Sequence, residues 1–165
     1  MSKKKIQKKA SSMESRWSDG LTIVFGGAFD PPHKGHREAV RSLFNLTGLR
    51  KVLVVPSATP PLKESQTSAE HRFKMTQLNF ESLPDDSLDY PIEVSPIEIE
   101  SASDSPSYSF DTLQLLKPQY DNLAFALGAD QLETLPKWHR FPEILGLCHW
   151  IVTVSYTHLT LPTSP

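Results

Sequence analysis

Residues 26–36 read GGAFDPPHKGH, and they combine residue types that an ordinary turn does not need. Gly26 and Gly27 would let the backbone approach a ligand closely, because neither carries a Cβ atom. Two prolines stiffen the segment, since each fixes φ and restricts the residue before it. His33 and His36 are three residues apart at the expected start of a helix, where unpaired amides attract anions. The segment therefore predicts a rigid phosphate site.

Other chemistries fit this segment less well. It contains neither the G-x-G-x-x-G pattern of dinucleotide-binding folds nor the G-x-x-x-x-G-K-[ST] pattern of P-loops. Zinc ligands on a helix usually stand four residues apart and need further partners, which the segment does not supply. Either histidine alone would be explained more simply as a capping or core residue. We therefore expect two histidine donors to phosphate and no metal site built from side chains.

Composition limits the class of protein. With 165 residues, 38% of them hydrophobic, the chain is long enough for one domain with a core. A formal net charge of -2 gives no general attraction to nucleic acid or to an anionic membrane. The single cysteine, Cys148, excludes an intrachain disulfide and favours the reducing cytoplasm. We find neither a membrane-spanning run nor the apolar stretch of a signal peptide.

The hydrophobic pattern predicts a parallel sheet. Continuous apolar runs predict buried strands at 21–25, 51–55, 123–127 and 149–154. The alternating segment 92–100 breaks at Pro96, which predicts an edge strand or a bulged hairpin. Helical spacing follows at 34–46 and 109–117, and Thr67 with Glu70 has the spacing of a capping box at the start of another helix. Its apolar positions are Ala69, Phe73 and Phe80.

Buried strands separated by helices indicate an α/β domain, a Rossmann-like doubly wound parallel sheet with helices on both faces. Ligands of such sheets bind beyond the carboxyl ends of the strands. Three segments leave those ends: 26–36, 56–63 and 128–138. A site that uses phosphate chemistry is therefore expected where these segments meet.

The opening segment resembles the signature of the nucleotidyltransferase superfamily that carries an HxGH motif. PPLK at 60–63, PSYSFDTL at 106–113 and GADQLETLPKW at 128–138 are similar to blocks of the bacterial nicotinate-nucleotide adenylyltransferases. The resemblance spans roughly residues 21–152. Phosphopantetheine adenylyltransferases and cytidylyltransferases resemble the segment less closely.

This resemblance implies transfer of AMP from ATP to nicotinate mononucleotide, with deamido-NAD and pyrophosphate as products. The reaction requires positioning and charge neutralisation rather than a general base, because the attacking phosphate is already ionised. The implied catalytic residues are His33 and His36, which would donate to ATP phosphates beside Mg²⁺ held mainly by those phosphates. Nicotinamide mononucleotide is an alternative acceptor.

The resemblance also implies two sets of binding residues. Those for ATP and its phosphates are Gly26, Gly27, Phe29, Lys63, Arg72 and Asp130. Those for the nicotinate nucleotide are Tyr108, Ser109, Thr112 and Trp138. Simpler alternatives stay open: Lys63 as a solvated loop residue, Arg72 on an exposed helix face, Asp130 with Glu133 as a helix cap, and core packing for Tyr108 and Trp138.

The two ends of the chain depart from the domain pattern. Residues 1–19 contain the lysine run of MSKKKIQKKA, from which we expect a disordered basic tail rather than an arm that binds nucleic acid. The nucleotidyltransferase domain is expected at 20–154. The family's late arginine-bearing loop and its I-S-S-T-x-x-R-like helix start have no counterpart, so we expect a truncated chain with a non-native tail at 155–165. A non-catalytic nucleotide-binding fragment is the alternative function.

Overall fold

The computed structural model describes residues 20–60, 67–81, 92–102 and 105–153. Within these residues the strands are β1 (Leu21–Gly27), β2 (Leu49–Pro56), β3 (Ile92–Val94), β4 (Leu123–Gly128) and β5 (His149–Thr153). The α-helices are α2 (Lys34–Leu43), α3 (Ala69–Glu81), α4 (Ile97–Glu100), α5 (Ser109–Leu116) and α6 (Ala129–Thr134). Two short 3₁₀ helices follow, η1 (Leu135–Lys137) and η2 (Glu143–Gly146).

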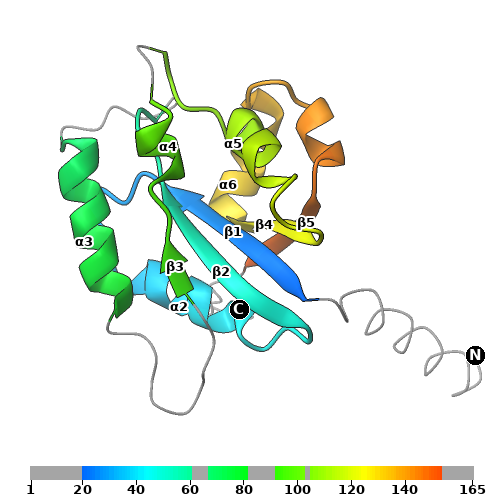
Figure 1. The fold of residues 1–165 in the computed structure, drawn as a ribbon, viewed down its shortest axis with the longest axis horizontal. Coiled ribbons are helices and arrows are strands. Elements are labelled where there is room, and N and C mark those ends of the chain that lie inside the picture. Colours follow the sequence, from blue (N-terminus) through cyan, green and yellow to red (C-terminus); the bar gives the residue numbers. More distant parts are fainter. Residues whose placement is uncertain (1–19, 61–66, 82–91, 103–104, 154–165) are drawn as a thin grey trace, which may run out of the picture.

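The five strands form one sheet in the order β3-β2-β1-β4-β5, and every neighbouring pair is parallel (Figure 1). The chain first builds outward from β1 to β2 and β3, and then returns to place β4 on the other side of β1. The strand order therefore reverses between β1 and β4, which is where a doubly wound sheet opens a crevice for ligands. The predicted α/β architecture is confirmed.

Both faces of the sheet are covered, which explains the continuous apolar runs in its central strands β1, β2 and β4. On one face, α2 and α3 pack against β1, β2 and β4, with Phe25, Val40 and Phe80 in the core. On the other face, α5 and the two 3₁₀ helices pack against the opposite side of the same three strands, with Leu53 and Leu113 in the core.

The prediction for residues 92–100 is partly wrong. β3 is an edge strand, as expected, but it pairs in parallel with β2 and ends at Val94, so there is no hairpin in this segment. Pro96 is the N-cap of α4, and the Ser95 hydroxyl accepts a hydrogen bond from the Ile97 amide at 3.4 Å. Proline suits a helix start because it lacks the N–H that would stay unpaired there.

The start of α3 also differs by one residue from the prediction. The cap is Ser68, whose hydroxyl accepts a hydrogen bond from the His71 amide at 3.2 Å, and not Thr67 with Glu70. The buried face of the helix consists of Arg72, Thr76 and Phe80. A charged residue therefore occupies the centre of a face that the sequence pattern assigned to apolar residues.

Some predictions fall outside the described residues. These are the tails at 1–19 and 155–165 and the phosphate contact of Lys63. In the part of the chain that the structure describes, no helix has the length and apolarity required to cross a bilayer.

Candidate active site

His33 and His36 form a reciprocal cap at the start of α2. His33 is the N-cap residue, and its Nδ1 accepts a hydrogen bond from the Gly35 amide at 3.1 Å. The His33 amide in turn donates to Nδ1 of His36 at 3.1 Å. The two rings stack with their centroids 3.8 Å apart and an angle of 23° between their planes. The structure thus brings the two predicted histidines together.

These bonds fix which nitrogen of each ring can donate. A neutral imidazole whose Nδ1 accepts a hydrogen bond carries its proton on Nε2. Each ring is therefore a cap through Nδ1 and a donor through Nε2. The first turn of α2 contains no acidic residue, so the positive end of its dipole is not offset there. This arrangement suits an anion with several oxygens.

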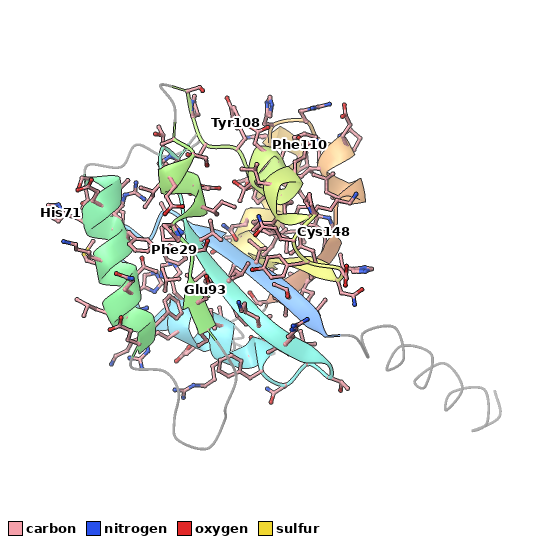
Figure 2. All side chains as sticks on the ribbon, viewed as in Figure 1. Phe29, His71, Glu93, Tyr108, Phe110 and Cys148 are labelled. Atoms are coloured by element: carbon pink, nitrogen blue, oxygen red, sulfur yellow. The ribbon has the colours of Figure 1, made fainter. Side chains whose placement is uncertain are left out.

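Aromatic rings support His36 from the core. Phe29 is 2% exposed and meets His36 edge to face, with centroids 4.9 Å apart. Phe29 also contacts Phe25 at 6.0 Å and Phe80 at 6.2 Å. Figure 2 shows Phe29 on the side of the sheet that α3 covers. The Phe29 ring is therefore buried as a support for His36, and the contact of this residue with ATP stays a prediction.

The glycines of the segment leave room for neighbouring rings. A Cβ on Gly27 would lie 3.3 Å from the Phe29 ring, and one on Gly26 would lie 3.3 Å from the Phe125 ring. A Cβ on Gly35 would lie 2.9 Å from Cε1 of His33. Close approach of the ligand to the backbone, which we predicted, stays a prediction for Gly26 and Gly27.

Arg72 joins three segments at the carboxyl end of the sheet. It is 1% exposed, and its Nη1 donates to the carbonyls of Ala28 at 2.8 Å and Ser57 at 2.6 Å. Its Nη2 donates to the Ala58 carbonyl at 2.9 Å, and its Nε donates to the Thr67 carbonyl at 3.1 Å. The segments that follow β1 and β2 are thereby tied to α3.

The burial of Arg72 decides between the sequence alternatives for it. An exposed helix face is wrong, and a contact with ATP phosphate stays a prediction because the described donors bind backbone carbonyls. Burial lowers the pKa of the guanidinium, and the nearby charges of Asp30 and Glu98 partly offset this shift. Arg72 is therefore a buried cation beside the phosphate segment.

Glu98 is a buried residue that sequence reasoning missed. It is 9% exposed, and its Oε1 accepts a hydrogen bond from the Thr112 hydroxyl at 2.7 Å. Burial raises the pKa of the carboxyl, while Thr112, the Ala58 amide and the Arg72 charge oppose that shift. The signal was Pro96, which starts a helix and places Glu98 in its first turn.

The start of α5 lies at the same end of the sheet, and Figure 2 shows Tyr108 and Phe110 there. Tyr108 is the N-cap residue, and no side chain caps this helix, which Ser109 begins. The Tyr108 ring stacks on His139 with centroids 4.1 Å apart and an angle of 19°. Sequence reasoning missed His139, because the stack joins two distant segments.

Two loops meet beside this helix start. The Thr59 amide donates to the Ser107 hydroxyl at 2.9 Å, and the Ser107 amide donates to the Thr59 carbonyl at 2.9 Å. The Ser57 amide donates to the Gly27 carbonyl at 2.9 Å. The segment after β2 therefore links the end of β1 to the start of α5.

The other predicted residues have different surroundings. Trp138 is half-buried against Phe125 and Trp150, at 5.8 and 6.3 Å, so core packing describes its place and pyridine stacking stays a prediction. Asp130 is exposed in the first turn of α6. The cap there is the bond from the Gly128 amide to Gln131, so the predicted alternative of an Asp130–Glu133 cap is wrong.

Comparison with known proteins agrees with this geometry. The family model described as cytidylyltransferase-like matches residues 24–164. The nicotinate-nucleotide adenylyltransferase of Bacillus subtilis is 38% identical over 132 residues, which cover 78% of this chain and 66% of that protein. A protein of Pectobacterium atrosepticum, named a probable nicotinate-nucleotide adenylyltransferase, is 38% identical over 80% of this chain and 60% of its own length.

Solved structures show the same fold. The Plasmodium falciparum nicotinic acid mononucleotide adenylyltransferase complexed with NaAD superposes with a TM-score of 0.63 at 19% identity, over 82% of this chain and 75% of that one. The chain spans 60–66% of the length of the two curated relatives named above. The extent of the family match shows that this chain belongs to the cytidylyltransferase-like family.

Proposed function

We propose that this chain transfers AMP from ATP to nicotinate mononucleotide, releasing pyrophosphate and forming deamido-NAD. The observation that carries the proposal is the stacked His33–His36 pair, capped through both Nδ1 atoms at the start of α2. It lies beyond β1, next to the reversal in strand order where a doubly wound sheet binds ligands. The names of the two bacterial relatives support the same reaction.

The proposed chemistry is an in-line displacement at phosphorus. A phosphate oxygen of the mononucleotide attacks the α-phosphorus of ATP, and the bond to the bridging oxygen breaks, so pyrophosphate leaves with the electron pair. The acceptor is already an anion, and no base is needed to remove a proton. The Nε2–H groups of His33 and His36 donate to phosphate oxygens as charge moves toward the leaving group.

Mg²⁺ would be held mainly by the nucleotide. Among the described residues there is no group of three or more His, Cys, Asp or Glu side chains that could hold a metal ion. Mg²⁺ keeps several waters and often binds through substrate phosphates, so this donor set is compatible with it. When bound, the ion would neutralise phosphate charge, while the histidines and the α2 amides orient the phosphates.

The start of α5 favours an acceptor that carries a carboxylate. No side chain caps this helix, so its first amides are available to an anion, while the carboxylate of Asp111 in the same turn offsets part of the positive end of the dipole. The Tyr108–His139 stack beside it offers flat rings to a pyridine. Nicotinate meets both requirements, whereas nicotinamide lacks the charge.

The single cysteine, Cys148, leads us to place the reaction in the reducing cytoplasm.

The test is pyrophosphate release from ATP with nicotinate or nicotinamide mononucleotide as acceptor. We expect His36→Ala to lower kcat by at least about 100-fold, the scale of losing one donor to the transition state. His71→Ala is the matched control, since the His71 side chain is exposed on α3 and the cap uses its backbone amide, which the variant keeps. Turnover of His36→Ala within a few-fold of the unchanged chain would contradict the mechanism. Nucleotide binding without pyrophosphate release would favour the non-catalytic alternative.

A further inference from the structure

Two buried ionisable side chains lie near the segment after β2. Arg72, on α3, donates to the carbonyls of Ser57 and Ala58. Glu98, on α4, lies near the same segment, and the Ala58 amide opposes the rise in its pKa that burial causes. The two side chains are 1% and 9% exposed. We call Arg72, Ser57, Ala58 and Glu98 the buried bridge.

Each end of the buried bridge reaches one half of the candidate site. Arg72 donates to the Ala28 carbonyl at 2.8 Å, and Ala28 precedes the segment that carries the histidine pair. Glu98 accepts from the Thr112 hydroxyl at 2.7 Å, and Thr112 belongs to α5. The same hydroxyl lies 3.3 Å from the Tyr108 carbonyl at the start of that helix. Arg72 therefore contacts the phosphate end of the candidate site, and Glu98 contacts the acceptor end.

Stability alone is a weak reason for such a bridge. Buried charges lose their hydration, and well-packed apolar residues often replace a buried ion pair without loss of stability. Oε2 of Glu98 is buried and has no hydrogen-bond partner among the described residues, which adds to the cost. Adenylyl transfer, in contrast, depends steeply on how the acceptor oxygen is placed relative to the α-phosphate.

We propose that Glu98 is a positioning residue, which acts through the buried bridge to align the acceptor nucleotide with ATP. This inference rests on the proposed function. Glu98 contacts neither substrate in the proposal. It sets the spacing between the His33–His36 pair and the start of α5, so its loss should lower the rate of the bound complex and leave the affinity for each substrate nearly unchanged.

The kinetic test uses Glu98→Met, which keeps the length of the side chain and removes both acceptor oxygens. We expect kcat to fall at least about tenfold, with KM for ATP and for the mononucleotide within about twofold. The matched control is Glu93→Met, because Glu93 is half-exposed on the edge strand β3, and its kcat should not change. Unchanged kcat in Glu98→Met, or a change confined to KM, would overturn the inference.

A second measurement needs no substrate and separates this inference from the proposed function. The Thr59 and Ser107 amides bond across the two loops that the bridge joins, and hydrogen exchange reports how often these bonds open. We expect both amides to exchange at least about tenfold faster in Glu98→Met, while amides of β1 keep their rates. Thr112→Val, which removes the other half of the 2.7 Å bond, should give the same result if Glu98→Met does not fold.

The possible outcomes are distinct. Exchange rates at Thr59 and Ser107 that match the unchanged chain in both variants would overturn the bridge and leave the proposed function standing. A chain that releases no pyrophosphate with either acceptor would overturn the proposed function, while the exchange experiment would still decide whether the bridge fixes the two loops.

Discussion

The histidine segment and the start of α5 are built by different kinds of contact. The cap between His33, Gly35 and His36 uses bonds between residues two or three positions apart. At the start of α5, the bond between Thr59 and Ser107 joins residues 48 positions apart. The bond of Arg72 to Ala28 spans 44 positions and connects the two regions. One half of the site is assembled locally, and the other requires the complete fold.

Because of this difference, substitutions in the two halves should have different effects on stability and activity. A local cap forms together with its own helix, so a change within it disturbs the ligand geometry and leaves the core intact. Contacts between distant segments are lost when any of the segments moves, and their buried polar groups then lack partners. Changes in the buried bridge should therefore reduce stability and activity together, while changes in the histidine segment should reduce activity first.

Arg72→Met gives the largest expected effect. The change leaves four backbone carbonyls without their donor and removes the cation near Glu98. We expect the free energy of unfolding to fall by at least about 3 kcal/mol, since each buried unsatisfied group costs roughly 1–3 kcal/mol. Urea denaturation measures this value. Arg41→Met, an exposed arginine in the last turn of α2, should change it by less than about 0.5 kcal/mol.

Gly35→Ala should separate activity from stability within the local half. The added Cβ would stand 2.9 Å from Cε1 and 3.0 Å from Nδ1 of His33, so the ring must move and its bond to the Gly35 amide must weaken. Alanine favours a helix over glycine by roughly 1 kcal/mol, which offsets the weaker cap.

For this variant we expect a fall in kcat of about tenfold with an almost unchanged midpoint of unfolding. Gly146→Ala is the control, because a Cβ there meets no heavy atom within 4 Å. A stable Gly35→Ala variant with full turnover would show that the exact position of the His33 ring does not matter.

The stability that depends on Glu98 should change with pH in a defined direction. Burial raises the pKa of this carboxyl in the folded chain above the ordinary value of 4.5, despite the opposing charge of Arg72. The folded state therefore holds the proton more tightly than the unfolded state. The contribution of protonated Glu98 to the free energy of unfolding is complete below pH 4.5, and it is lost as the pH rises through the folded-state pKa.

Urea unfolding of the unchanged chain and of Glu98→Gln over a pH series measures this effect. The unchanged chain should lose stability relative to the variant as the pH rises above 4.5. A difference that stays constant, or that changes in the opposite direction, would show that the carboxyl does not keep its buried place.

The smallest effect is expected at Lys51 and Glu93. This pair tests whether a contact between distant residues contributes strongly to stability even when it is not buried. Their 2.8 Å ion pair joins residues 42 positions apart, but the two side chains are 31% and 50% exposed. Exposed pairs contribute about 0–1 kcal/mol. A double-mutant cycle with Lys51→Met and Glu93→Gln should give a coupling in this range that decreases with added salt.

The sequence predicted the fold well because each central strand is buried on both faces. Runs such as LTIVF and LAFAL have no polar alternation, and helical patterns separate them, so a parallel sheet was the simple solution. The histidine pair was predictable for a related reason. Its spacing, its glycine and its place after a strand are all local, and the structure keeps them together.

The contacts between distant segments were not predictable from one sequence. An arginine in an amphipathic helix is normally assigned to the solvent side, yet Arg72 occupies the buried face of α3, where carbonyls of other segments meet it. Glu98 was read as part of a strand, although Pro96 starts a helix there. The stack of Tyr108 on His139 depends on how η1 is placed after β4. Patterns within a segment carry no information on such partners.

The backbone of Phe29 constrains any attempt to engineer this protein. Its φ of 50° lies in the left-handed region, which glycine adopts at lower energy than an aromatic residue does. Its ring nevertheless packs edge to face against His36 from the core side. In a library randomised at position 29, selection for heat resistance and selection for turnover should therefore enrich different residues. A thermostable variant from such a library would have to be assayed separately for catalysis.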